Sequence, residues 1–310
     1  MLEGEDRFRT EEDCRAYLAR LRWPQGFCCP RCRHPQAWRL QGGVFPCRGC
    51  DAIVSVTAGT IFHRSHLPLR VWFRAIWWGT NQKSGVSALG LQRTLGLGSY
   101  ETAWACLHKL RRAMVRPGRE PLTEEVEVDE IYVGGVERGG GKRHLGDTKA
   151  LVGVAAEVRG HGIGRIRLQR LPDASAESLV GFVRKTVAPG AVVRTDGWTA
   201  SPGLAQHGYR HRPRPITGSG QTASTLLPRV HRVAALLKRW LLGSHQGRIS
   251  REHLNEYLEE FTFRFNRRLS HHRGKLFYRL LQQAVVIDPV PYDRLVVKRR
   301  THQPRGLRAT

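Results

Sequence analysis

The sequence predicts an α/β (α+β) protein in which a mixed β-sheet flanked by helices follows a small metal-binding unit and a helical region. Three observations lead to this prediction. Two cysteine pairs lie close together before residue 57, apolar residues recur at helical spacing between 58 and 117, and three β-like runs begin at residue 126 before helices return. A chain of 310 residues is long enough for two or three domains with their own cores.

The charge of the chain favours a polyanionic partner. Lysine and arginine number 51 against 26 acidic residues, so the formal net charge is +25. This balance does not suit a neutral metabolite or a cationic substrate, whereas it suits nucleic acid. Eight tryptophans and 40% hydrophobic residues exclude a disordered basic tail or a histone-like chain.

No run of about 18 apolar residues and no secretory signal pattern occurs in the sequence, so we expect no membrane association and a cytoplasmic, nucleoid-associated location. Five of the seven cysteines fall between Cys28 and Cys50. In a reducing compartment such clustering favours a metal over disulfides. The remaining two, Cys14 and Cys106, are expected to be small buried apolar residues.

The clustered cysteines form two CxxC pairs, Cys29-Pro-Arg-Cys32 and Cys47-Arg-Gly-Cys50, separated by 14 residues. This spacing lets two turns place four thiolates around one Zn²⁺. We therefore predict a structural zinc ribbon at 25–57, after an N-terminal adapter at 1–24 that contains a helix at 11–21. Four reduced cysteines without metal are the alternative.

The next region, 58–117, is expected to be helical and to bind DNA. From Gly85 onward the pattern is helix, glycine-containing turn and helix, as in helix-turn-helix proteins. An ordinary helical hairpin is the alternative. The second helix is expected to present a basic outer face with the residues Tyr100, Glu101, His108, Lys109, Arg111 and Arg112.

A third, larger domain is expected at 118–290. Its β-like runs at 126–133, 150–158 and 163–171 suggest an antiparallel meander broken by the turn Gly139-Gly140-Gly141. A helix at 175–187, with Ser175 as N-cap, and a strand at 191–195 follow. This order resembles the ribonuclease H-like fold. We further expect a loop at 199–224 with one short strand near Tyr209, helices at 226–242 and 250–266, and a basic tail at 291–310.

Two aspartates stand at the ends of strand-like runs. Asp129 and Asp196 could together bind a divalent cation such as Mg²⁺, which activates water or a 3′-hydroxyl in phosphoryl transfer. His231, 35 positions after Asp196, is a candidate third ligand. Lys238 lies seven positions further on the same helical face and is expected to contact a DNA phosphate.

Alternative interpretations remain open for the helical residues. His231, Lys238 and Arg239 could form a basic surface stripe instead of a site. A second group, Glu260, Arg264 and Arg267, shares one helical face and forms either a solvated ion-pair ladder or a cluster that orients DNA. The third ligand could also come from Glu259, Glu260 or a water.

Taken together, the motifs resemble bacterial insertion-sequence transposases of the family numbered fifteen-ninety-five. The residues that carry the resemblance are the four cysteines and the segments 55–63, 128–135, 195–198, 231–243 and 260–268. The resemblance implies a zinc ribbon joined to a ribonuclease H-like, DDE-type transposase domain, with Asp129 and Asp196 as the first two catalytic positions. It also implies double-stranded DNA, as transposon ends and target, and a homo-oligomeric synaptic complex.

The chain departs from the general pattern of two aspartates and a glutamate because His231 stands at the third position. Histidine prefers softer ions than Mg²⁺, so we expect that Mn²⁺ is tolerated. We retain Glu260 as a further catalytic candidate. The predicted activity is metal-dependent cleavage and strand transfer at terminal inverted repeats; a decayed transposase or a DNA-binding regulator is the alternative.

Overall fold

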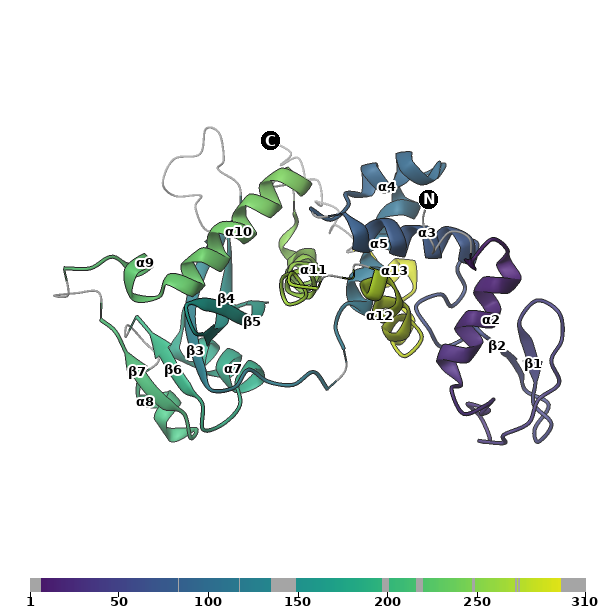
Figure 1. Cartoon of the computed structure of the whole chain (residues 1–310), viewed down its shortest axis with the longest axis horizontal. Coiled ribbons are helices and arrows are strands. Elements are labelled where there is room, and N and C mark those ends of the chain that lie inside the picture. Colours follow the sequence, from purple (N-terminus) through teal and green to yellow (C-terminus); the bar gives the residue numbers. More distant parts are fainter. Residues whose placement is uncertain are drawn as a thin grey trace, which may run out of the picture.

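A computed structural model describes residues 7–82, 84–116, 118–134, 149–196, 201–215, 220–246, 249–270, 272 and 274–296. Figure 1 shows a β-sheet with its helices at one end of the molecule and the cysteine-rich ribbon at the other, with a bundle of helices between them. The turn predicted at 139–141 lies outside the described residues.

The N-terminal part begins with helix α2 (Glu11–Arg22) and the two strands of the ribbon, β1 (Val44–Pro46) and β2 (Ile53–Ser55). Helix α2 starts at a capping box: the Thr10 hydroxyl accepts the Asp13 N–H (3.1 Å) while the Asp13 carboxylate accepts the Thr10 N–H (2.8 Å). The two strands pair antiparallel. They hold the cysteine loops beside α2 (Figure 1).

The helical region consists of α3 (Leu69–Asn81), α4 (Ala88–Leu95) and α5 (Tyr100–Ala113). Gly96 ends α4 in the left-handed conformation that glycine adopts at low cost (φ 64°), which makes the sharp turn into α5. Helix α12 (Gly274–Ala284) packs against α3 and α5, and its Phe277 and Leu280 share the core of Trp72 and Leu110. Part of the segment expected at 118–290 therefore belongs to this core.

The helix α13 (Tyr292–Leu295) lies next to α5 at the start of the expected tail, and its Leu295 is buried. The beginning of that segment is thus packed. Residues 297–310 lie outside the described residues.

The large sheet has five strands in the order β5-β4-β3-β6-β7. Their bounds are β3 (Glu125–Val133), β4 (Ala150–Arg159), β5 (Gly162–Arg170), β6 (Val192–Thr195) and β7 (Arg210–Pro213). The first three pair antiparallel, as the meander predicts, while β6 is parallel to β3 and β7 is parallel to β6. This mixed sheet confirms the predicted fold class.

Successive strand residues point to opposite faces of the sheet, so both faces carry apolar side chains and helices cover both. Val126 and Val128 pack with α7 (Ala176–Thr186) on one face, while Ile131 and Val133 pack with α10 (Pro228–His245) and α11 (Leu254–Phe265) on the other. Ser175 caps α7 as predicted. The short 3-10 turn η2 (Arg251–His253) precedes α11.

The segment predicted as a loop at 199–224 contains more structure than expected. Strand β7 confirms the short strand near Tyr209. Two short helices, α8 (Ser201–Gln206) and α9 (Ala223–Leu226), were not expected. Residues 197–200 and 216–219 are not described.

Candidate active site

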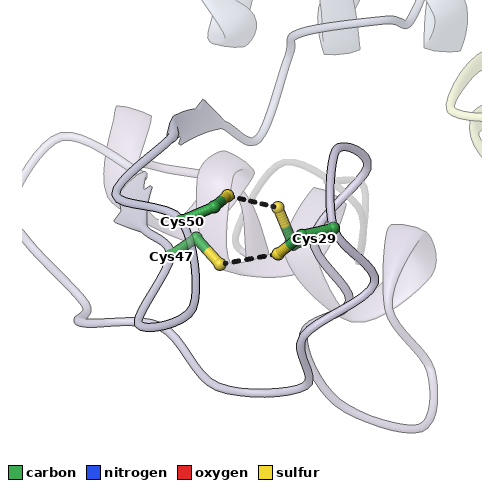
Figure 2. Close-up of side chains that lie close together, drawn as sticks. Cys29, Cys47 and Cys50 are labelled. Carbon is green, nitrogen blue, oxygen red and sulfur yellow. Dashed lines mark hydrogen bonds between the residues drawn. The ribbon is translucent and has the colours of Figure 1, made fainter.

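The four cysteines of the ribbon gather as their spacing predicts. Their sulfur atoms all lie within 4.8 Å of one another. Cys29 Sγ is 3.8 Å from Cys50 Sγ and Cys32 Sγ is 3.5 Å from Cys47 Sγ, and Figure 2 shows the side chains facing one another across the two loops. Four converging thiols of this kind form a closed structural zinc site. Cys28 is exposed and outside the cluster.

Asp129 and Asp196 come from neighbouring strands of the large sheet. The parallel register of β3 and β6 sets Glu127 opposite Arg194, so two further steps bring Asp129 level with Asp196 where β6 ends. Burial, and after it the nearby carboxylates of Glu130 and Asp196, raise the pKa of Asp129 to about 7. Burial and Asp196 also raise the pKa of Glu130. A cluster of carboxylates thus lies beside the C-terminal end of β6.

His231 lies on the first turn of α10 and faces this cluster. Its Nε2 is 3.6 Å from Oδ2 of Asp129, too far for a hydrogen bond, and this buried nitrogen has no hydrogen-bond partner among the described residues. Burial lowers the pKa of His231 more than the nearby Glu127 raises it, and Lys238 lowers it further. The imidazole is therefore neutral near pH 7 and offers a lone pair.

Glu127 fixes the start of α10, a role that the sequence did not suggest. It is fully buried, and its Oε2 accepts the backbone N–H groups of Arg229 (2.7 Å) and Val230 (3.1 Å). Its Oε1 accepts a bond from the Arg229 guanidinium (2.8 Å). Since no side chain of the preceding residue caps α10, a strand carboxylate satisfies the free N–H groups of this helix.

Strand alternation places Glu127 and Asp129 on the same face of β3. One strand therefore supplies both the anchor of α10 and the carboxylate that His231 faces. The signal available in the sequence was the i, i+2 spacing of these two acids, which is lost in a crowd of six acidic residues between 120 and 130.

Glu260 does not belong to this cluster, which corrects the expectation that it is catalytic. It is 3% exposed in α11, and its two carboxylate oxygens accept from Arg111 Nε (2.8 Å) and Arg264 Nε (2.9 Å). Burial raises the pKa of Glu260, but Arg264 and Arg111 outweigh this effect and hold it at about 2. The carboxylate joins α11 to α5.

The position of α11 along α10 confirms this separation. Phe261, next to Glu260, packs on Trp240 with ring centroids 5.7 Å apart. Trp240 follows His231 by nine residues on α10, which is about 13 Å along a helix.

Two residues expected on the basic outer face of the second helix are buried. His108 is fully buried and Arg111 is 2% exposed, with its guanidinium bound to Glu260. The reason is that α5 is covered by α3 and α4 on one side and by α11 on another, so its α11-facing side is not an outer face. Lys109 is half-buried and Arg112 is exposed.

Of the remaining residues expected to contact DNA, two are exposed and two contact other parts of the protein. Lys238 and Arg239 are exposed on α10. Arg264, in contrast, donates to two backbone carbonyls at the end of α3 and to the carboxylate of α11 described above, so it holds helices together. Arg267 stacks on the ring of Phe263 at 4.0 Å from the centroid.

The residues around Asp129 suit a divalent cation by their chemistry. Carboxylates from Asp129 and Asp196, with Glu130 beside them, are hard oxygen donors, and the Nε2 of His231 has no hydrogen-bond partner in the described part of the chain. Within the described residues only the cysteine quartet brings its ligand atoms as close together as a bound metal requires.

Architecture and site together define a class of protein. A ribonuclease H-like mixed sheet, flanked by helices and preceded by a four-cysteine zinc ribbon, is the architecture of a transposase. Two family models match the chain accordingly: the transposase zinc-ribbon domain at residues 9–52 and the ISXO2-like transposase domain at residues 121–266. The chain belongs to the insertion-sequence transposase family that joins these two domains.

A similar protein from Halobacterium salinarum is described as an uncharacterized protein in transposable element ISH50. It is 27% identical over 274 residues, which cover 83% of this chain and 91% of the relative. The similarity therefore extends over most of both chains. Along the described parts of the chain, no helix combines the length and apolar character needed to cross a membrane.

Proposed function

We propose that this transposase binds the terminal inverted repeats of its insertion sequence and catalyses metal-dependent DNA strand cleavage and strand transfer. The observation that carries the proposal is the proximity of Asp129, Asp196 and His231, which come from the middle of β3, the end of β6 and the start of α10. Buried carboxylates in an otherwise basic protein need a positive counter-charge, and a divalent cation provides it.

In this proposal Asp129 and Asp196 hold Mg²⁺ or Mn²⁺, with the neutral imidazole of His231 as the third ligand. A cation bound there would activate a water or a 3′-hydroxyl and stabilise the leaving oxygen. Glu127 keeps the imidazole in place through the start of α10. Lys238, exposed two turns further along α10, would contact a DNA phosphate close to the scissile bond.

Binding of the transposon ends is assigned to the zinc ribbon and the helix-turn-helix. Exposed Arg112 and half-buried Lys109 on α5, with Arg239 on α10, are the proposed phosphate contacts. The net charge of +25 supplies the sequence-independent part of the affinity. Since two ends must be processed together, the proposal includes an assembly of more than one copy, located with the nucleoid in the cytoplasm.

The test uses DNA that flanks the gene and carries the inverted repeats, in a supercoiled plasmid, with Mg²⁺ or Mn²⁺ added. Asp129→Asn and Asp196→Asn are expected to abolish strand cleavage and leave DNA affinity nearly unchanged, because they remove metal ligands and no phosphate contact. His231→Ala is expected to lose most of the cleavage rate, and His231→Glu to retain more of it in Mg²⁺ than alanine does.

The matched control is Glu177→Gln, which neutralises an exposed acid on α7 and should cleave at the wild-type rate. Cleavage at the wild-type rate by Asp129→Asn would refute the assignment of the site. A wild-type protein that binds the ends and cleaves in neither metal would instead indicate a decayed transposase or a regulator. Full activity of His231→Ala in both metals would remove His231 from the site.

A further inference from the structure

A cavity of about 290 Å³ lies where the helical region meets the sheet, between β5, α11 and the segment that leads from α5 to β3. Five arginines and two glutamates are among its lining residues. The cavity is separate from the carboxylate cluster, since Asp129, Asp196 and His231 do not line it.

Three of the five arginines are neutralised by carboxylates. Arg119 binds Glu259 through both of its terminal nitrogens (2.6 and 2.9 Å). Arg165 binds Glu157 at 2.6 Å, and Arg116 lies 3.6 Å from the second glutamate of the lining, Glu120. These pairs leave two cations to be explained.

Arg167 and Arg267 have no such partner: no carboxylate of the described residues lies within ion-pair distance of either. Arg167 is 5% exposed, and within the described parts of the chain it donates only to the backbone carbonyls of Ile166 (2.9 Å) and Glu120 (2.6 Å). Arg267 donates to the carbonyl of Phe263 (3.2 Å) and stacks on its ring. Neither guanidinium therefore has a direct ion-pair partner among the described residues, although Glu259 and Glu157 are near enough to raise the pKa of Arg167.

The surroundings of both guanidinium groups are unfavourable for a cation. Burial, and then Arg119 and Arg165, lower the pKa of Arg167 to about 10. Burial, and then Arg279 and Arg116, lower the pKa of Arg267 to about 10. Both remain charged at neutral pH, and a buried charge without a counter-ion is costly.

A neutral donor completes the lining. Thr262 is 3% exposed in α11, lines the same cavity, and its hydroxyl has no hydrogen-bond partner among the described residues. An unpartnered buried hydroxyl beside two guanidinium groups that bind no carboxylate directly is a set of donors that an anion can complete. The volume leaves room for a tetrahedral oxyanion with several waters.

We propose that this cavity is a phosphate-binding site, with Arg167 and Arg267 as its charged ligands and the Thr262 hydroxyl as a neutral one. A phosphate oxyanion suits the planar donor array of arginine. The phosphate belongs either to the DNA backbone, which rests on the proposed DNA binding, or to a small phosphorylated ligand. In both cases a bound phosphate bridges β5 and α11, because Arg167 comes from the strand while Thr262 and Arg267 come from α11 and the residues just after it.

The first experiment measures binding of inorganic phosphate to the full chain by calorimetry at constant ionic strength. The Arg167→Met/Arg267→Met double variant is expected to bind phosphate about tenfold more weakly or worse, because charge-assisted hydrogen bonds are lost. Arg267→Met alone, on the half-buried rim, gives a milder change that keeps Arg167 in place. The control Arg184→Met removes an exposed arginine from α7 and should bind phosphate like wild type.

The second experiment measures the affinity of the same proteins for a random-sequence DNA duplex as a function of salt. If the phosphate comes from DNA, the double variant loses affinity and its salt slope falls by about 1 unit per lost contact. If the ligand is a small phosphorylated molecule, phosphate binding is lost while DNA affinity and slope stay unchanged. The proposal is overturned if the folded double variant binds both phosphate and DNA as tightly as wild type. It is also overturned if wild type binds no phosphate and the double variant binds DNA like wild type. Neither readout depends on DNA cleavage, so failure here is distinct from failure at Asp129.

Discussion

At the scale of single residues, the buried contact between Glu127 and α10 leads to a stability prediction. Glu127→Ala removes the only carboxylate bound to Arg229 among the described residues and exposes two helix N–H groups to an apolar environment. We expect the free energy of unfolding to fall by about 3 kcal/mol, since breaking a buried pair from one side is strongly destabilising. Glu127→Gln should lose less. Denaturant unfolding measures both.

The control for this prediction is Glu177→Ala, an exposed acid that should change stability by less than about 0.5 kcal/mol. Hydrogen exchange adds a local readout, because the amide of Val230 should lose protection in Glu127→Ala. Equal stability of the two alanine variants would show that the carboxylate does not anchor the helix.

Single residues also show how far sequence reasoning reaches. Asp129 and Asp196 could be paired from the sequence because each was predicted to end a strand. Asp196 does follow the end of β6, but Asp129 lies in the middle of β3, and the parallel register of the two strands brings them level. Arg111 and His108 were assigned to an outer face, which is wrong. The buried side of a helix with one apolar stripe can be recognised in the sequence. A helix that is covered from two sides also buries polar residues, and their partners can be distant: Glu260 on α11 is about 150 positions from Arg111.

At the scale of elements, α5 carries a matched pair of neighbouring arginines. Arg111 is buried against Glu260, while Arg112 is exposed. Arg111→Gln is expected to destabilise the protein by about 2–3 kcal/mol by leaving part of a buried carboxylate unpaired. Arg112→Gln should leave stability within about 0.5 kcal/mol and weaken DNA binding.

Unfolding curves and DNA titrations on the two variants separate these roles. Reduced DNA affinity of a fully stable Arg111→Gln protein would restore Arg111 to the DNA-binding face. Unchanged DNA affinity of Arg112→Gln would remove the outer face of α5 from the proposed interface.

The zinc ribbon is a second element with a testable property. Its apolar cluster is small, with Cys29, Cys47 and Val54 as the buried residues, so metal binding should supply most of its stability. Removal of Zn²⁺ by a chelator is expected to expose the four thiols to a thiol reagent and to change the fluorescence of Trp23, which packs on the cluster. Unchanged thiol reactivity after complete zinc removal would contradict this account.

The bounds of most strands and helices could be read from the sequence within a few residues, because periodicity and caps such as Ser175 are local signals. The partner of a helix is not local. Helix α12 packs on α3 and α5 although about 160 residues separate it from α5, and nothing in its own pattern distinguishes that partner from the sheet. Because α12 already belongs to the core of the helical region, the domain boundary expected at 290 does not lie where one core ends and another begins.

At the scale of the whole molecule, the junction between helical region and sheet is polar as well as apolar. It contains the pair of Arg111 and Glu260, the pair of Arg119 and Glu259, and a buried histidine on α5. Figure 1 shows α11 lying between the two parts of the molecule. The stability of this junction should therefore depend on pH.

The pH dependence follows from His108. Its ring lies 4.0 Å from that of Trp104 and 4.8 Å from that of His253. Burial, and then Arg111, His253 and His245, lower its pKa to about 2. Below about pH 6.5 the unfolded chain binds a proton that the native chain does not. The contribution of neutral His108 to stability is thus fully present above pH 6.5. As the solution is acidified below this pH, the free energy of unfolding decreases by about 1.4 kcal/mol per pH unit for one such histidine.

His108→Phe keeps an aromatic ring in this position and removes the titration, so its free energy of unfolding should decrease less between pH 6.5 and 5 than that of wild type, by up to about 1.4 kcal/mol per pH unit. His245, whose pKa burial chiefly lowers to about 4, leaves a remaining slope in the variant. Substitution of exposed His161 by Gln is the control and should keep the wild-type slope. Denaturant unfolding at several pH values measures all three proteins. Parallel curves for wild type and His108→Phe would mean that His108 is protonated in the native state, and the junction would then tolerate a charge that its burial and its arginine neighbour oppose.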